Sequence, residues 1–309
     1  MRPSDATHNH TIGEEERLRF YLGKLAEVQG VLPSIEISAE HKLGRPCHYS
    51  KHDRHEDVIP NYRTDLLRLL AHTKRDRLCF LCGDTIYTGE TYPVLVKTRD
   101  SHDDQSNGVI CSLQSKRHWN LTFSDIPWKK KTSDYFWRGA DTGKYSDNNQ
   151  RLSFVESYFS DRVGFSKYEQ NFSRSPDRYL QKYLLGSVPR REIMQYKYQV
   201  VLEGNDKASN LNWVLHSNSV PIMSRPKYHS WLCESYLKPG VHYVEVDEDF
   251  SDFDDEITWC QENDDLAKEI AMNGKRFMSQ FLSVEREALI EQKLIESVDQ
   301  IYAESQSRL

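Results

Sequence analysis

The chain has 309 residues, and a prior of roughly 150 residues per domain suggests two domains and excludes a single small stapled module. Its 17 Tyr, 12 Phe and 6 Trp residues supply a large apolar area, which excludes an intrinsically disordered chain. With 41 Lys and Arg residues against 47 Asp and Glu residues, the net charge is −6. This balance gives no general attraction to nucleic acid or to an anionic membrane surface.

The location of the protein is predicted from three further features of the sequence. No stretch approaches the roughly 18 uninterrupted apolar residues that a membrane-spanning helix needs. The first ten residues, MRPSDATHNH, contain no apolar run of the kind found in a secretory signal. The six cysteines are scattered, which favours free thiols in a reducing cytosol. We therefore expect a cytoplasmic protein without a transmembrane segment.

The first half of the chain predicts few regular elements. Residues 14–28 have acids in their first turn and apolar residues at helical spacing, which predicts an amphipathic helix. We expect a charged loop over 41–60, a short helix over 65–71, a buried strand over 92–97 that stops at residues 98–100, and an irregular region over 100–131.

From residue 132 onwards, strand and helix patterns alternate, as a doubly wound α/β domain requires. The predicted strands are 134–137, 195–202, 219–223 and 242–246, and the predicted helices are 150–159, 208–216, 231–237, 252–262, 265–282 and 284–305. Residues 138–149 are predicted as a glycine-containing loop. The domain boundary is placed near Lys131, with an N-terminal domain over 1–131, a C-terminal domain over 132–283 and a final helix over 284–309 that packs back on the N-terminal domain.

Three turns of the second half, at 138–143, 204–209 and 225–228, are candidates for phosphate binding. In an open α/β sheet, ligands bind beyond the carboxyl ends of the strands. Free backbone N–H groups and helix N-termini there favour anions, and Arg138, Lys197 and Lys207 supply full charges. None of these turns has a known phosphate-loop signature, so ordinary turns that serve the fold are the alternative.

Asp100 follows a buried strand in the other predicted domain. A carboxylate at this place can accept a hydroxyl proton as a general base, and the alternative is an Asp that only forms a turn. Its neighbour Arg99 is either a supporting partner or a solvated residue.

Two further groups of residues have metal-ligand chemistry. Cys79 and Cys82, together with Cys47 and the histidines at 48, 52 and 55, are residue types that bind zinc. The alternative is a set of partly buried thiols and exposed imidazoles. The acidic run 246–256 lacks the order of a calcium loop, and we expect its carboxylates to stabilise a helix N-terminus instead.

Several segments in register resemble glycosyltransferase family 90, which includes protein O-glucosyltransferases, capsule xylosyltransferases and bacterial lipopolysaccharide-modifying proteins. The resemblance covers roughly residues 94–282. Its motifs are the T-R-D segment at 97–100, I-P-W-K at 126–129, F-W-R-G-A-D-T-G at 136–143, Y-K-Y-Q-V-V-L-E-G at 196–204, S-N-L at 209–211, S-N-S-V at 217–220, 231–246 and 263–274. The segments at 203–206 and 217–219 are most similar to bacterial and viral members.

The resemblance implies a GT-B architecture, with two Rossmann-like domains facing each other across a cleft. It also implies metal-independent transfer of glucose or xylose from a UDP-sugar to a glycan hydroxyl, with inversion at the anomeric carbon. No cofactor is expected beyond the UDP-sugar co-substrate. Asp100 would be the general base. The implied nucleotide-sugar-binding residues are Arg138, Gly139, Thr142, Lys197, Gly204, Asn205, Lys207, Ser209, Asn210, Arg225 and Glu234.

One departure from the family pattern concerns the charge at the diphosphate. Animal members carry an Arg in an S-F-R-L segment, where this chain has Ser209, Asn210 and Leu211. Lys207 or Arg225 would then supply the missing charge. The W-P that follows T-R-D in animal members is also absent. Two alternative functions stay open at this stage. A glycoside hydrolase needs a pair of carboxylates, and a zinc-stabilised binding module would use the Cys and His residues.

Overall fold

The structure, a computed structural model, describes residues 11–27, 45–50, 53, 59–89, 93–102, 106–143, 149–167 and 179–307. Two compact units divide these residues, and the division does not follow the chain in a simple order. Unit 1 holds the described residues within 118–226 and 236–279, and unit 2 those within 11–117, 227–235 and 280–309. The chain therefore passes from unit 1 to unit 2 for a short excursion at 227–235, and again before the final helix.

Unit 1 is built on a five-stranded parallel sheet with the order β11-β9-β8-β6-β7. Its strands are β6 (Thr132–Ala140), β7 (Val163–Lys167), β8 (Tyr196–Val200), β9 (Val220–Met223) and β11 (Val244–Glu245). All residues of β9 and most of β8 are buried, as expected of parallel strands covered on both faces. The four predicted strands of this half are confirmed, and β7 was not predicted.

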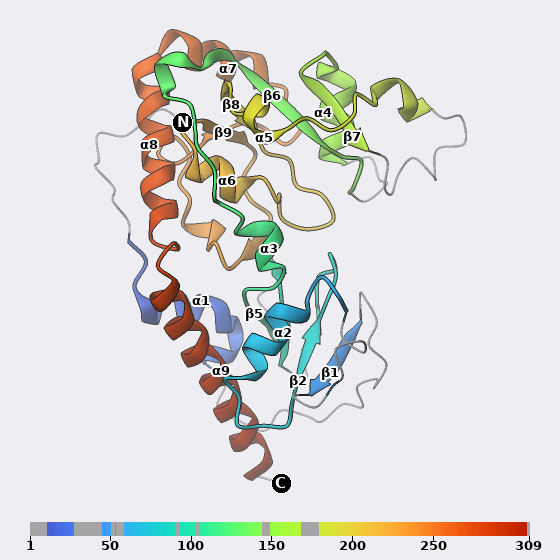
Figure 1. The fold of residues 1–309 in the computed structure, drawn as a ribbon, viewed down its shortest axis with the longest axis vertical. Helices are drawn as coiled ribbons and strands as arrows, with labels where there is room; N and C mark the ends of the chain where they lie inside the picture. Colours follow the sequence, from blue (N-terminus) through green and yellow to red (C-terminus); the bar gives the residue numbers. More distant parts are fainter. Residues whose placement is uncertain are drawn as a thin grey trace. The chain divides into compact units, whose positions relative to one another are not determined.

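Helices cover the sheet of unit 1 (Figure 1). They are α4 (Gln150–Tyr158), α5 (Arg190–Ile193), α6 (Leu211–His216), α7 (Phe253–Glu262) and α8 (Asp264–Ser279), with 3₁₀ helices η2 (Trp128–Lys130) and η4 (Tyr179–Tyr183). α6 and α8 pack against β9, α7 against β6 and α4 against β7. Phe154 of α4 and Phe253 of α7 are in edge-to-face contact within the hydrophobic core of this unit.

Unit 2 has a four-stranded mixed sheet with the order β1-β2-β3-β5. β1 (Pro46–Ser50) is antiparallel to β2 (Arg77–Leu81), and β2, β3 (Val94–Val96) and β5 (Gly108–Ile110) are parallel. Its helices are α1 (Glu14–Leu22), continued by η1 (Gly23–Ala26), then α2 (Arg63–Leu70) and α9 (Val284–Ser307). α9 packs against both α1 and α2. The short helix α3 (Ser115–His118) lies where the chain leaves this unit.

A separate two-stranded ribbon of unit 2 pairs β4 (Thr98–Asp100) with β10 (Tyr228–Ser230). The excursion at 227–235 supplies β10, so residues far apart in the sequence form this ribbon. The prediction of a helix over 231–237 was wrong: after β10 ends at Ser230, the structure has a turn and the 3₁₀ helix η5 (Glu234–Tyr236). The physical reason lies at Cys233, whose backbone φ of 57° is incompatible with an α-helix.

Other boundaries also differ from the predictions. β6 continues to Ala140, so Arg138 and Gly139 lie in a strand and not in a loop. α6 begins at Leu211, later than predicted. β1 occupies part of the predicted loop 41–60, because the alternating burial of Cys47 and Tyr49 is typical of a strand despite the surrounding charge. β2 and β5 were not predicted.

Candidate functional site

The loops that follow β6, β8 and β9 meet at the carboxyl edge of the unit 1 sheet, and two residues of α4 join them. The guanidinium of Arg151 donates to the carbonyl oxygens of Ala140 (3.1 Å), Leu202 (3.2 Å) and Glu203 (3.2 Å). It also donates to the hydroxyl of Thr142. The amide of Gln150 donates to the hydroxyl of Ser224 at 2.8 Å. This edge is the place where open α/β sheets bind ligands.

Gly204 fits closely against this arrangement. A Cβ atom added at Gly204 would lie 3.0 Å from the Arg151 guanidinium carbon and 3.0 Å from the Thr142 hydroxyl oxygen. The backbone N–H of Gly204 donates to the carbonyl oxygen of Asp206 at 3.0 Å, which closes the turn. The structure thus brings together two of the predicted site residues, Thr142 and Gly204, with Arg151 between their loops.

Arg151 is the residue that the sequence reasoning missed. It lies in the first turn of α4, where Asn149 caps the helix by accepting from the N–H of Leu152 at 3.2 Å. The sequence signal for this role is a basic residue at the start of a predicted helix, directly after a glycine-containing loop. That signal does not predict that the Arg151 side chain turns back to the loop after β8.

The turn between β8 and α6 contributes four more predicted residues. Asn205 and Ser209 are half-buried at its surface. Lys207 is buried, and its ammonium donates to the side-chain oxygen of Asn212 at 2.9 Å. The amide of Asn210 donates to the carbonyl oxygen of Val200 at 2.9 Å. Lys207 and Asn210 therefore hold the turn in shape through internal bonds.

Arg225 follows β9 at the same edge. Its side chain is 75% exposed, and its Nε lies 3.2 Å from a carboxylate oxygen of Glu245 at the end of β11. Of the two substitutes predicted for the missing family arginine, Arg225 has the accessible charge and Lys207 has the buried one.

Arg138 and Gly139 lie inside β6, beside β7. The guanidinium of Arg138 donates to the carbonyl oxygens of Gly186 (3.0 Å) and Asp161 (2.7 Å). Burial lowers its pKa, and its Nε has no hydrogen-bond partner within the described residues. Arg138 thus ties β6 to the segments on either side of β7.

Lys197 lies near the amino end of β8, opposite to the edge just described. Its ammonium donates to Asp264 (2.5 Å) and Ser133 (2.8 Å), and it lies 5.0 Å from the ring centroid of Trp128. The indole N–H of Trp128 donates to the same Asp264 carboxylate at 3.0 Å. The structure does not bring Lys197 to the loops that hold Thr142 and Gly204.

Asp100 is the last residue of β4 in unit 2, opposite Tyr228 of β10. Its carboxylate is 39% exposed and accepts a hydrogen bond from the backbone N–H of His102 at 2.9 Å. The ring Nδ1 of His102 lies 3.4 Å from the same carboxylate. This bond from the N–H two residues further on forms an Asx turn, as in the turn-forming alternative. The exposed part of the carboxylate still has the chemistry that a general base needs.

The neighbour Arg99 is buried and supports the ribbon from the other side. It donates to the carbonyl oxygens of Phe20 (2.6 Å) at the end of α1 and Gly108 (2.9 Å) in β5. The solvated alternative for Arg99 was wrong, because its guanidinium is buried against backbone carbonyl oxygens.

Glu234 belongs to unit 2, whereas the other predicted nucleotide-sugar-binding residues belong to unit 1. Its buried carboxylate accepts from the backbone N–H and the hydroxyl of Ser230, both at 2.6 Å. These bonds hold the turn that follows β10, beside the ribbon that carries Asp100.

The cysteine cluster has the chemistry of buried thiols. Cys47, Cys79, Cys82 and Cys111 are buried, and burial raises the pKa of Cys82 to about 12. His52 and His55 lie outside the described residues. Across the ranges that the structure describes, no group of three or more His, Cys, Asp or Glu residues is arranged to hold a metal ion.

Two other predictions concern the acidic run and the membrane. Asp254, Asp255 and Glu256 form the first turn of α7, which confirms that the run stabilises a helix N-terminus. In the described parts of the chain, every helix is too short or too polar to cross a lipid bilayer.

Comparison with known proteins identifies similar sequences. The sequence model of Glycosyl transferase family 90 matches residues 115–297. "O-glucosyltransferase LpsA" of Dichelobacter nodosus is 32% identical over 254 residues, which cover 79% of this chain and 72% of that protein. "Protein O-glucosyltransferase 2" of Danio rerio is 30% identical over 151 residues, or 48% of this chain and 29% of that protein. "Uncharacterized protein 179R" of Invertebrate iridescent virus 6 is 25% identical over 219 residues, or 59% of this chain and 17% of that protein.

Proposed function

The chain belongs to glycosyltransferase family 90, and on this basis we propose that it transfers glucose from UDP-glucose to a hydroxyl group of a glycan. The names of the bacterial and zebrafish relatives, both O-glucosyltransferases, favour glucose over xylose. Neither a glycoside hydrolase nor a zinc-stabilised module has a comparable observation in its favour.

The main support for a donor site in unit 1 is that the Arg151 side chain bonds to the loops after both β6 and β8. Its guanidinium holds the ends of β6 and β8 together through their carbonyl oxygens and presses against Gly204. Loops fixed in this way present their remaining backbone N–H groups without reorganisation, which favours a diphosphate. The exposed guanidinium of Arg225 supplies positive charge at the same edge. Thr142, Asn205 and Ser209 supply polar side chains there.

The proposed mechanism is inverting and needs no metal ion. Asp100 removes the proton from the acceptor hydroxyl, and the oxygen attacks the anomeric carbon from the face opposite UDP. The bond between this carbon and the UDP oxygen breaks, and UDP leaves with the bonding electrons. Backbone N–H groups and the Arg151 and Arg225 guanidinium groups then stabilise the negative charge that develops on the diphosphate.

The proposal includes a GT-B architecture, with the donor on unit 1 and the acceptor base on unit 2. In this architecture, the two roles need residues from both units: the proposed donor loops belong to unit 1, and Asp100 belongs to unit 2. The proposal assigns no direct contact with the donor to four of the predicted residues, because each packs against or bonds to other parts of the protein. These residues are Arg138, Gly139, Lys197 and Glu234.

Thermal unfolding with different nucleotides tests the donor site. A ligand at a hundred times its dissociation constant stabilises the folded state by about 2.7 kcal/mol. We expect the melting temperature to rise with UDP and UDP-glucose and to rise less with GDP or UMP. A melting temperature that stays constant with every nucleotide would contradict the proposal.

A further inference from the structure

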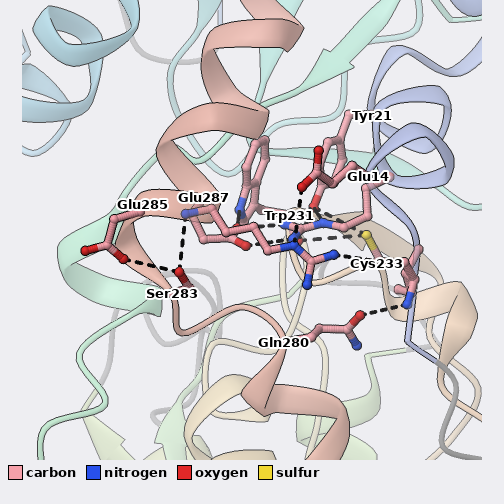
Figure 2. A network of polar contacts seen from close by, with 11 residues as sticks. Glu14, Tyr21, Trp231, Cys233, Gln280, Ser283, Glu285 and Glu287 are labelled. Carbon is pink, nitrogen blue, oxygen red and sulfur yellow. Dashed lines mark hydrogen bonds and ion pairs between the residues drawn. The ribbon is translucent and has the colours of Figure 1, made fainter.

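A buried network of charged and aromatic side chains connects three separate segments of unit 2 (Figure 2). Arg17 of α1 is fully buried, and its guanidinium donates to both carboxylate oxygens of Glu287 in α9, each at 2.6 Å. The indole N–H of Trp231, which follows β10, donates to the same carboxylate at 2.6 Å. Glu287 thus receives hydrogen bonds from both other segments.

Tyr21 of α1 makes further contacts with Trp231 besides the hydrogen bond of its indole N–H. The two rings stack with their centroids 4.2 Å apart and an angle of 8° between their planes. The Tyr21 hydroxyl donates to the carbonyl oxygen of Trp231 at 2.8 Å and accepts from Arg17 at 2.7 Å. Burial raises the pKa of Tyr21, so the hydroxyl keeps its proton and remains a donor. Trp231 is therefore fixed by its indole N–H, its ring face and its backbone.

The strand that ends next to Trp231 is the partner of the strand that carries Asp100. β10 pairs with β4 so that Tyr228 lies opposite Asp100, and the N–H of Ser101 donates to the carbonyl oxygen of Lys227 at 2.8 Å. A ribbon of two three-residue strands has little stability of its own. The position of the Asp100 carboxylate consequently depends on what holds β4 and β10 from outside.

Arg99 connects β4 to α1, because its guanidinium donates to the carbonyl oxygen of Phe20 near the end of that helix. The same helix also carries Arg17 and Tyr21. The Arg99 guanidinium lies against Gly23, where an added Cβ would approach it to 2.3 Å and where the backbone φ is 56°. Both strands of the ribbon are thus fastened to α1. Arg99 connects β4 to α1, and Trp231, which follows β10, connects that strand to α1 and α9.

We propose that Arg17, Tyr21, Trp231 and Glu287 form a positioning network for Asp100, which sets where the base carboxylate stands during transfer. This inference rests on the proposed function, because it takes Asp100 as the base. Directional hydrogen bonds fix a strand position more narrowly than apolar packing does. Removing the Arg17 guanidinium from water is costly, and a role in positioning explains why unit 2 contains this ion pair beside the ribbon.

The test uses Trp231→Phe in the full chain, with Lys293→Gln as the matched control. Trp231→Phe removes the N–H donated to Glu287 and keeps an aromatic ring against Tyr21. Lys293→Gln removes a 3.0 Å ion pair with Glu14, which joins the same helices α1 and α9 without touching β10. Two readouts are compared: hydrogen exchange of the peptides covering 98–101 and 227–230, and kcat for UDP release from UDP-glucose with a panel of soluble oligosaccharides.

We expect Trp231→Phe to speed exchange in both ribbon peptides and to lower kcat about tenfold or more, since small misplacement of a catalytic group costs that much. The dissociation constant of UDP and exchange in β6 and β8 should stay unchanged, and Lys293→Gln should leave all readouts at wild-type values. Tyr21→Phe, which removes the hydroxyl bound to the Trp231 carbonyl, should act in the same direction and serves if Trp231→Phe fails to fold.

Wild-type kcat and wild-type ribbon exchange in both variants would overturn the positioning role. It would also be overturned if exchange rose equally throughout α1, α9 and the ribbon while kcat fell only with the folded fraction, because the network would then be structural alone. If the wild-type protein releases no UDP from any UDP-sugar, the proposed function fails instead. The exchange measurement still decides in that case whether the network anchors the ribbon.

Discussion

In unit 1, the candidate donor site is made of loops that directly follow β6, β8 and β9, and Arg151 of the next helix ties two of them through backbone carbonyl oxygens. In unit 2, Asp100 stands on a ribbon whose partner strand comes from 227–235 and whose supports come from α1 and α9. The proposed donor site therefore depends on loops of one sheet and the helix beside it, whereas the proposed base depends on α1, on 227–235 and on α9. Substitutions in the proposed donor loops should change UDP binding, and substitutions in the Asp100 ribbon or its supports should change turnover.

Asp100→Asn should produce the largest loss of transfer rate of the four substitutions in this section, and it should distinguish most clearly between turnover and UDP binding. An amide cannot accept the hydroxyl proton, so transfer should fall by about 10²- to 10⁴-fold. The affinity for UDP should remain that of the wild-type protein, because the proposed donor loops belong to unit 1 and Asp100 belongs to unit 2. Initial rates of UDP release together with calorimetric titration of UDP measure both effects. A variant that keeps the full transfer rate would show that Asp100 is not the base.

Arg151→Lys should weaken UDP binding strongly, because an ammonium cannot replace a planar fork that bonds several carbonyl oxygens at once. We expect the UDP affinity to fall by about 10- to 100-fold, as for the loss of one or two charge-assisted hydrogen bonds. Arg162→Ala is the control, since Arg162 pairs with Asp134 in the same unit and belongs to none of the donor loops. Equal UDP affinities of both variants and the wild type would remove Arg151 from the site.

Gly204→Ala should have a smaller effect on the same measurement. The added Cβ would lie 3.0 Å from Arg151 and from Thr142, so the guanidinium has to shift by a few tenths of an ångström. We expect a loss of severalfold in UDP affinity, by titration calorimetry. Gly13→Ala is the matched control, because a Cβ there meets no atom within 4 Å. Identical affinities of the two variants would mean that the turn adapts freely.

Lys197→Met should affect stability and leave UDP affinity unchanged. Burial raises the pKa of Asp264, but the hydrogen bonds from Lys197 and Trp128 outweigh it, so its pKa lies below the usual value. A lowered pKa in the folded state means that the pair contributes stability above about pH 4 and loses it as the pH falls further. Removal of Lys197 should therefore cost about 1–2 kcal/mol at pH 7 and less near pH 3, measured by urea unfolding. A loss of UDP affinity in this variant would instead show that Lys197 contributes to donor binding.

The sequence predicted the regular part of unit 1 and the final helix of unit 2 well, because their strands and helices follow clear periods. The strands near 134–137, 195–202 and 219–223 and the helices of the last sixty residues agree with the structure within a few residues. The family resemblance was also confirmed. Short strands such as β2 and β5 were missed, since three to five buried residues are too few for a recognisable period.

The candidate site was harder to predict, because its contacts depend on direction as well as on residue type. Lys197 has the charge expected at a phosphate, yet it stands at the amino end of its strand and pairs with Asp264. Glu234 falls within a matched motif, but 227–235 leaves unit 1 and carries it to the Asp100 ribbon. Arg151 has no motif, and only the fold brings its side chain back to two loops.

The configuration of the product formed from UDP-glucose tests the central claim most directly. Glucose is α-linked in this donor, and a single displacement assisted by one base inverts the anomeric carbon. We expect the wild-type protein with a soluble oligosaccharide acceptor to form a β-glucoside, seen by proton NMR, with one UDP released for each bond made. An α-glucoside, or free glucose as the sole sugar product in the presence of an accepted oligosaccharide, would contradict the account.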